Sequence, residues 1–146
     1  MRLLKSQSGF TMIELVVVIV ILGILSAFAV PRFANLRGEA RSAAVNGMSG
    51  GLRSAVGVAK VKYQVVGNMA ATKVDLDGTS VTVAASTGVP AGSAAGIGAA
   101  LQDTSGFTID YTTPTAVTFR PSGGTATCQA SYNGTTGVVS TDVSNC

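Results

Sequence analysis

Few side chains in this 146-residue sequence could do chemistry, and their types exclude most catalytic arrangements. There is no histidine, so Ser-His-Asp triads, Cys-His pairs and histidine-ligated metal sites are excluded. No pair of carboxylates or activated nucleophile is apparent, and we therefore expect no enzyme activity, no metal site and no cofactor. What remains is one carboxylate, Glu14, at the start of a long apolar run, and two cysteines, Cys128 and Cys146.

The two cysteines are 18 positions apart, near the end of a Gly- and Thr-rich segment. In a secreted domain with a small core, a cysteine pair most often forms one disulfide, with two reduced buried thiols as the alternative. A bond between Cys128 and Cys146 would tie the tail to the strand that carries Cys128. It would also place this part of the chain in an oxidising compartment.

The apolar run extends over residues 10–30, 21 residues in which Glu14 is the only charge. As a helix it would be about 31 Å long, enough to cross the hydrocarbon core of a bilayer. Strands rarely continue so far without a break. The run therefore predicts a membrane-inserted helix.

Three kinds of N-terminal segment fit this helix. The first alternative is a secretory signal that is cut after Ala29. Its basic residues would be Arg2 and Lys5, and residues 27–29 (Ala-Phe-Ala) would supply the small-x-small pattern of a cleavage site after the apolar run. Glu14 argues against that, because a carboxylate at bilayer depth costs about 2.5–3.5 kcal/mol. The second alternative is a plain single-span anchor, which basic residues on both sides leave without a clear orientation.

The third alternative rests on the junction GFTMIE, from Gly9 to Glu14, between a short basic leader and the apolar run. This junction resembles the processing site of type IV prepilins and the related pseudopilins. The resemblance implies that a membrane peptidase cuts between Gly9 and Phe10 and that the new Phe10 amine is N-methylated. Unlike a secretory signal, the apolar helix would stay on the mature protein.

Glu14 then has an expected partner. Phe10 and Glu14 are four residues apart, so the carboxylate lies within about a turn of the positive helix N-terminus. A charge in lipid needs a partner, and the Phe10 ammonium of a neighbouring subunit can supply one and fix the register between helices. The alternative is a carboxylate that reaches the lipid headgroups without a partner.

The helical pattern continues beyond the membrane segment to Tyr63. Apolar or small residues recur every three or four positions and form an amphipathic stripe; they are Phe33, Leu36, Ala40, Ala44, Met48, Leu52, Val56, Ala59 and Tyr63. Pro31 removes a helical hydrogen bond, which predicts a kink near residues 26–31. By resemblance to pilins, the stretch between Gly23 and Pro31 is expected to lose helical structure in assembled filaments.

After Tyr63 the composition changes to short alternating runs with many Gly, Thr and Ser residues. Residues 74–76 and 81–83 predict a hairpin, residues 107–111 and 116–120 a second pair, and residues 127–132 a further strand. Residues 88–101 predict a loop with a helical turn. The fold class is therefore α+β: a long N-terminal helix packed on a small antiparallel sheet.

Charge is divided unevenly between the two halves. Residues 1–74 carry a net charge of +7 and residues 75–146 a net charge of −4. Such segregation favours self-association as readily as nucleic-acid binding, and no specific nucleic acid is expected.

The sequence thus predicts four segments. They are a leader (1–9), a membrane and filament-core half of the helix (10–30), an amphipathic half (31–63) and a β-sheet head with a disulfide loop (64–146). Within the superfamily, residues 21–36 (ILGILSAFAVPRFANL) are most similar to the mannose-sensitive haemagglutinin pilins.

The resemblance implies a structural filament subunit used for surface attachment. Its expected partners are other copies of itself, a prepilin peptidase, the pilus assembly machinery and a surface or host receptor. The monomer is expected in the inner membrane with its C-terminal domain in the periplasm, and the polymer outside the cell. The alternatives are the major pseudopilin of a type II secretion system and, in another class, a membrane-tethered or secreted ligand-binding module.

Overall fold

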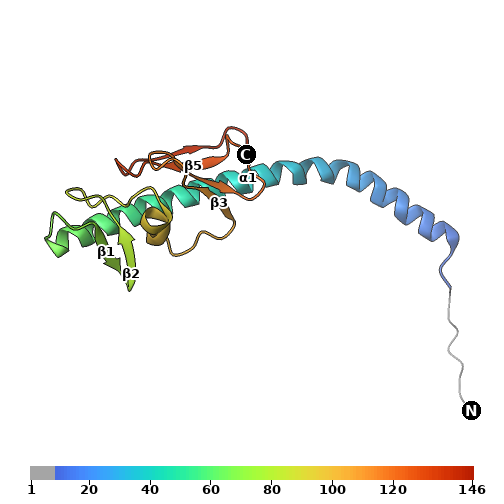
Figure 1. Cartoon of the computed structure of the whole chain (residues 1–146). Helices are drawn as coiled ribbons and strands as arrows, with labels where there is room; N and C mark the ends of the chain where they lie inside the picture. Colours follow the sequence, from blue (N-terminus) through green and yellow to red (C-terminus); the bar gives the residue numbers. More distant parts are fainter. Residues whose placement is uncertain (1–8) are drawn as a thin grey trace, which may run out of the picture. The chain divides into compact units, whose positions relative to one another are not determined.

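The computed structural model describes residues 9–146, apart from the side chains of residues 31, 34 and 35. Its elements, in chain order, are α1 (Met12–Val66), β1 (Lys73–Leu76), β2 (Thr79–Thr82), η1 (Ala94–Gly98), β3 (Phe107–Asp110), β4 (Val117–Pro121), β5 (Gln129–Tyr132) and β6 (Val139–Asp142) (Figure 1). The predicted α+β class, a long N-terminal helix followed by antiparallel strands, is confirmed. Of the predicted leader, only Gly9 lies within the described residues.

Helix α1 matches the helix expected over residues 10–63 to within a few residues. The chain divides into two compact units, one up to Arg37 and one from Gly38 onward, and α1 contributes residues to both. The backbone is helical at both Gly23 and Pro31, and the kink and the loss of helix between them stay predictions. The helix ends at Val66 because Gly67 adopts a left-handed conformation (φ 70°), which suits glycine after a helix C-terminus.

The strands form two sheets, so the expectation of a single sheet is wrong. Strands β1 and β2 pair only with each other, with Val74 opposite Val81. Their turn has positive φ at both Asp77 (53°) and Gly78 (82°), the geometry that an Asp-Gly hairpin turn predicts. This predicted hairpin is therefore confirmed, but it is separate from the other strands.

The second sheet is a four-stranded antiparallel meander in the order β3-β4-β5-β6. The predicted pairing of its first two strands is confirmed, with Ile109 opposite Phe119. The sequence did not predict β6, because its exposed Ser140 and Thr141 give no apolar alternation. The side chain of Arg53 on α1 donates a hydrogen bond to the Val139 carbonyl of this edge strand (3.4 Å).

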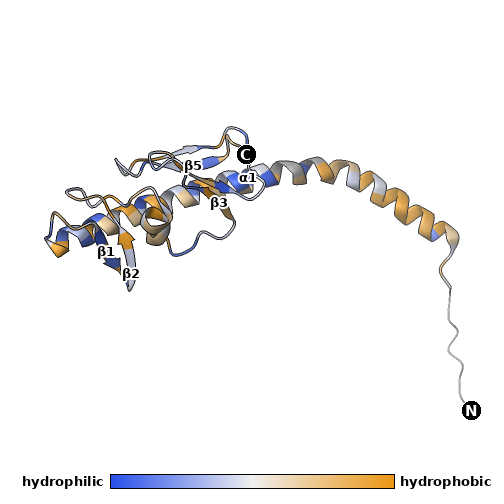
Figure 2. Cartoon of the chain, viewed as in Figure 1, coloured by the Kyte–Doolittle hydropathy of each residue, from blue (hydrophilic) through white to orange (hydrophobic). Residues whose placement is uncertain are grey.

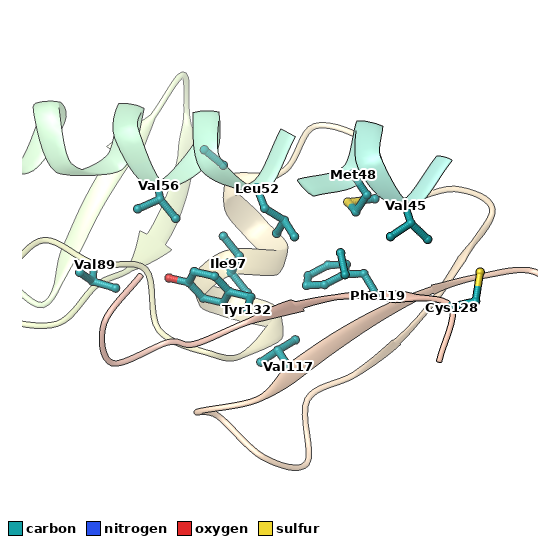
Figure 3. Packing of buried hydrophobic residues seen from close by; sticks show 12 residues of the cluster. Val45, Met48, Leu52, Val56, Val89, Ile97, Val117, Phe119, Cys128 and Tyr132 are labelled. Carbon is teal, nitrogen blue, oxygen red and sulfur yellow. The ribbon is translucent and has the colours of Figure 1, made fainter. Parts of the chain in front are cut away.

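The main core lies between α1 and the four-stranded sheet. Figure 3 shows Met48, Leu52 and Val56 on α1 together with Phe119 and Tyr132 on the strands, and all five are buried. A smaller cluster joins α1 to the hairpin, and its members are Ala59, Tyr63, Val74, Val81 and Val83. The same face of α1 therefore covers both sheets.

The predicted apolar stripe is buried only in its second part, from about residue 45 onward. From Met48 to Tyr63 its members are buried within the unit that contains the sheets. Phe33 and Leu36, at the start of the stripe, are 65% and 53% exposed. The first part of the stripe is therefore left uncovered by the part of the chain that the structure describes.

Two buried tyrosines fix the loops that connect the sheets. The Tyr132 hydroxyl donates a hydrogen bond to the Pro90 carbonyl (2.6 Å), and burial raises the pKa of Tyr132. The Tyr63 hydroxyl donates to the Met69 carbonyl (2.5 Å) and accepts from the Ser86 amide (2.7 Å). These bonds satisfy loop backbone groups that the sheets leave unpaired.

Replacing Leu52, which is fully buried, by alanine tests the packing of α1 on the sheet. We expect Leu52→Ala to lower the free energy of unfolding by about 2–5 kcal/mol, since the surroundings of such a cavity relax only partly. Urea unfolding of the full chain in detergent micelles, followed by near-ultraviolet circular dichroism of the tyrosines, measures the change. The control Val58→Ala, on the same helix but exposed, should change it by about 0.5 kcal/mol or less. Equal losses in both variants would contradict the assignment of the core.

Candidate functional site

The start of α1 is a capping box formed by Thr11 and Glu14. The Glu14 carboxylate accepts hydrogen bonds from the Thr11 amide (3.0 Å) and the Thr11 hydroxyl (2.8 Å). In return, the Glu14 amide donates to the Thr11 hydroxyl oxygen (3.3 Å). Each residue thus satisfies a backbone amide that the helix N-terminus leaves free.

Sequence reasoning gave Glu14 a partner in another subunit and missed Thr11. The signal was present in the sequence, since a Thr followed three residues later by Glu before an apolar run is typical of a helix N-terminus. The capping box holds the carboxylate against the first turn of α1. A carboxylate can accept about four hydrogen bonds, and the structure assigns two to Glu14, so capacity for another donor remains.

A shallow recess adjoins this carboxylate. Its volume is 390 Å³, and it is lined by Phe10, Ile13, Glu14, Val17 and Val18. Phe10 itself is 82% exposed. The predicted processing residues, Gly9 and Phe10, and the predicted pairing residue Glu14 therefore lie together at one end of the helix, beside an apolar surface.

The segment Met12–Val30 is apolar and uncovered. It is 19 residues long with a mean hydropathy of 2.9, and none of it is buried among residues 9–146. Figure 2 shows the hydrophobic colouring along this part of α1. Leaving each large apolar side chain in water costs about 1.5–3 kcal/mol, so the segment needs an apolar environment supplied from outside the chain. Its length suits a bilayer core.

Cys128 and Cys146 form the disulfide that the sequence favoured, with a Cα–Cα distance of 4.8 Å. Cys128 is buried beside β5, and the bond fixes the end of the described chain to this strand. The Cys146 carbonyl also accepts a hydrogen bond from the Arg41 side chain on α1 (3.3 Å). The disulfide thus ties the tail to the sheet, and the hydrogen bond from Arg41 ties the tail to α1.

Charged groups within residues 9–146 form no ion pair within 4 Å. Three exposed carboxylates instead accept both the hydroxyl and the amide of the residue two positions on, which lowers the pKa of each; they are Asp103, Asp110 and Asp142. Among the same described residues, no cluster of three or more acidic or cysteine side chains could hold a metal ion.

Comparison with known proteins places this N-terminal geometry in a family context. Residues 4–30 match the family model described as the prokaryotic N-terminal methylation motif. Over 54 residues the chain is 52% identical to the type IV narrow pilus major component PilA5 of Thermus thermophilus, covering 37% of this chain and 47% of that protein. Over 50 residues it is 40% identical to the type IV major fimbrial protein FimA of Dichelobacter nodosus, covering 34% of this chain and 32% of that protein.

The predicted resemblance to type IV pilins is confirmed by these matches. The chain spans less than half the length of the curated relatives it matches. No solved structure matches it. The resemblance to the mannose-sensitive haemagglutinin type stays a prediction.

Removing the disulfide should destabilise the head. For Cys128→Ala/Cys146→Ala we expect a loss of about 3 kcal/mol in the free energy of unfolding, because the unfolded chain is no longer held in a closed loop. Urea unfolding of the full chain in micelles measures it. Dithiothreitol should lower the stability of the unmodified chain by a similar amount and leave the variant unchanged. A stable, reductant-insensitive parent chain would contradict the prediction.

Proposed function

We propose that this chain, which carries the methylation motif of type IV pilins, is the structural subunit of a type IV pilus used for surface attachment. The observation that carries the proposal is the helical segment Met12–Val30, which is apolar apart from Glu14 and Ser26 and is not buried by any part of the chain that the structure describes. In a monomer, lipid surrounds this segment. In a filament, the same segments of neighbouring copies surround it, so that one apolar environment replaces another.

Processing at the Gly9–Phe10 bond would leave this segment at the start of the mature chain. Gly9 has open space around it and Phe10 is exposed, which suits access by a membrane peptidase. The capping box supports the same assignment, because Thr11 and Glu14 satisfy each other's backbone amides at the first turn of α1, directly after the Gly9–Phe10 bond. N-methylation of the Phe10 amine would keep it basic.

Pairing of Glu14 with the Phe10 ammonium of a neighbouring subunit would place two opposite charges together inside the filament. The recess beside Glu14 and its unused acceptor capacity leave room for such a donor. Burying either charge alone is costly, so the pair favours helices that associate in one register. In this account Glu14 caps its own helix and also pairs with the Phe10 ammonium of the neighbouring subunit.

The cellular setting follows from the same assignment. The monomer spans the inner membrane once, with the disulfide-bonded head in the oxidising periplasm, and the assembled filament lies outside the cell. The partners are a prepilin peptidase, the assembly machinery, other copies of the chain, and a surface or host receptor. The role is structural and not catalytic.

Intact-mass spectrometry of sheared surface filaments tests the proposed function. The expected result is a filament whose major component starts at Phe10, carries one methyl group on its amine and contains one closed disulfide. A chain that starts at Val30 would indicate a secretory signal, and a chain that keeps Met1 would indicate a plain anchor; either result refutes the proposal. Normal surface filaments in a strain that lacks this chain would refute its role as the major subunit.

Two substitutions separate the two roles of Glu14. Glu14→Gln retains a side chain that can complete a capping box but removes the charge, so filament yield should fall by at least about tenfold. Thr11→Val removes the cap but keeps the charge, and should reduce the yield much less. Quantifying sheared filaments against the membrane pool of processed subunit measures both. Normal piliation in Glu14→Gln would contradict the pairing role.

A further inference from the structure

Near its C-terminal end, α1 carries three exposed valines on the side opposite the core. Val58, Val61 and Val65 recur at helical spacing and are 54%, 60% and 77% exposed. Ala59 and Tyr63, which alternate with these valines in the sequence, are buried in the smaller cluster. A helix at a protein surface normally carries polar residues opposite its core face, so this second apolar face requires a separate explanation.

One cation borders this face. Lys62 is four residues after Val58 and three before Val65, so it lies on the same side of the helix. It is exposed and has no hydrogen bond or ion pair within residues 9–146. No acidic residue occurs between Glu39 and Asp75, so α1 offers Lys62 no opposite charge nearby. We refer to Val58, Val61, Lys62 and Val65 as the outer patch.

A free acidic surface occurs on the β1–β2 hairpin. Asp75 accepts one hydrogen bond, from the Gly78 amide (3.0 Å), and Asp77 at the turn accepts none. The carboxylates near the four-stranded sheet are already engaged by their own turns, as described above. Lys73 is the one cation on the hairpin, which leaves this element with a net negative charge.

The hairpin cannot cover the outer patch of its own chain. Val74 and Val81 of the hairpin pack on Ala59 and Tyr63, which lie on the opposite side of α1 from Val61. The acidic hairpin and the outer patch therefore face different directions within one unit. A contact between them requires two molecules.

We propose that the outer patch binds the acidic β1–β2 hairpin of a second copy of this chain. The valines supply the apolar part of the contact, and Lys62 lies opposite Asp75 and Asp77. Two outer patches facing each other would bring like charges together, whereas patch and hairpin are complementary. Because the two surfaces differ, the contact is heterologous and can continue along an open polymer. The inference rests on the proposed function and adds a contact between heads to the contact between apolar helices.

A charge swap in the full-length chain, expressed in its own pilus-forming cells, tests the contact. Lys62→Glu and Asp75→Lys should each lower the yield of sheared filaments by at least about tenfold, because each places like charges together. The double variant Lys62→Glu/Asp75→Lys restores opposite charges and should recover the yield to within about threefold of the parent chain. The disulfide-bonded subunit in the membrane is measured in parallel as evidence of folding.

Lys60→Glu is the matched control. A change at Lys60 alters the net charge equally, but Lys60 is half-buried and lies toward the core side, four residues after Val56 and three before Tyr63. It should therefore leave assembly unchanged. A loss equal to that of Lys62→Glu would overturn the assignment of the patch.

A photo-crosslinking amino acid at Val61 provides a second test that needs no charge change. The expected product is a dimer whose crosslinked peptide contains residues 73–82. A crosslink to α1 or to the four-stranded sheet of the other copy would overturn the proposal. In the charge swap, a double variant whose filament yield is no higher than that of the worse single variant would overturn it as well. Failure of the parent chain to form any filament would instead contradict the proposed function.

Discussion

The exposure of the apolar segment Met12–Val30 is the constraint on which the rest of the structure depends. A helix satisfies its own backbone hydrogen bonds, so this segment can enter lipid without a partner. It cannot remain in water, because the described residues of the chain leave its large side chains uncovered. The segment must therefore lie in an apolar environment that other molecules supply. Lipid and a bundle of identical helices are two environments that meet this requirement.

The same constraint explains why the one charged side chain of the segment, Glu14, lies near its beginning. The capping box brings the Glu14 carboxylate to the Thr11 amide and hydroxyl, at the first turn of the helix. The head must supply stability by other means, since it has a small core. It does so through the face of α1 that covers both sheets, through two buried tyrosine hydroxyls, and through one disulfide.

Much of this architecture could be predicted from local patterns. The Asp77-Gly78 turn and the alternation in β4 indicated their strands, because turn chemistry and burial on one face act locally. Strand β6 has no such alternation, and its pairing depends on β5 and on Arg53 from α1. The separation into two sheets depends on which part of α1 each sheet covers. At the candidate site, the sequence indicated Glu14 and Phe10, and only a reading of the first turn as a capping box would have added Thr11.

Hydrogen exchange of sheared filaments in water, free of lipid and detergent, tests the central claim most directly. If neighbouring copies cover Met12–Val30, the amides of residues 12–22, where the helix is expected to persist in the filament, should exchange at least as slowly as those of the buried stretch around Leu52. Rapid exchange of residues 12–22 in intact filaments would contradict the account.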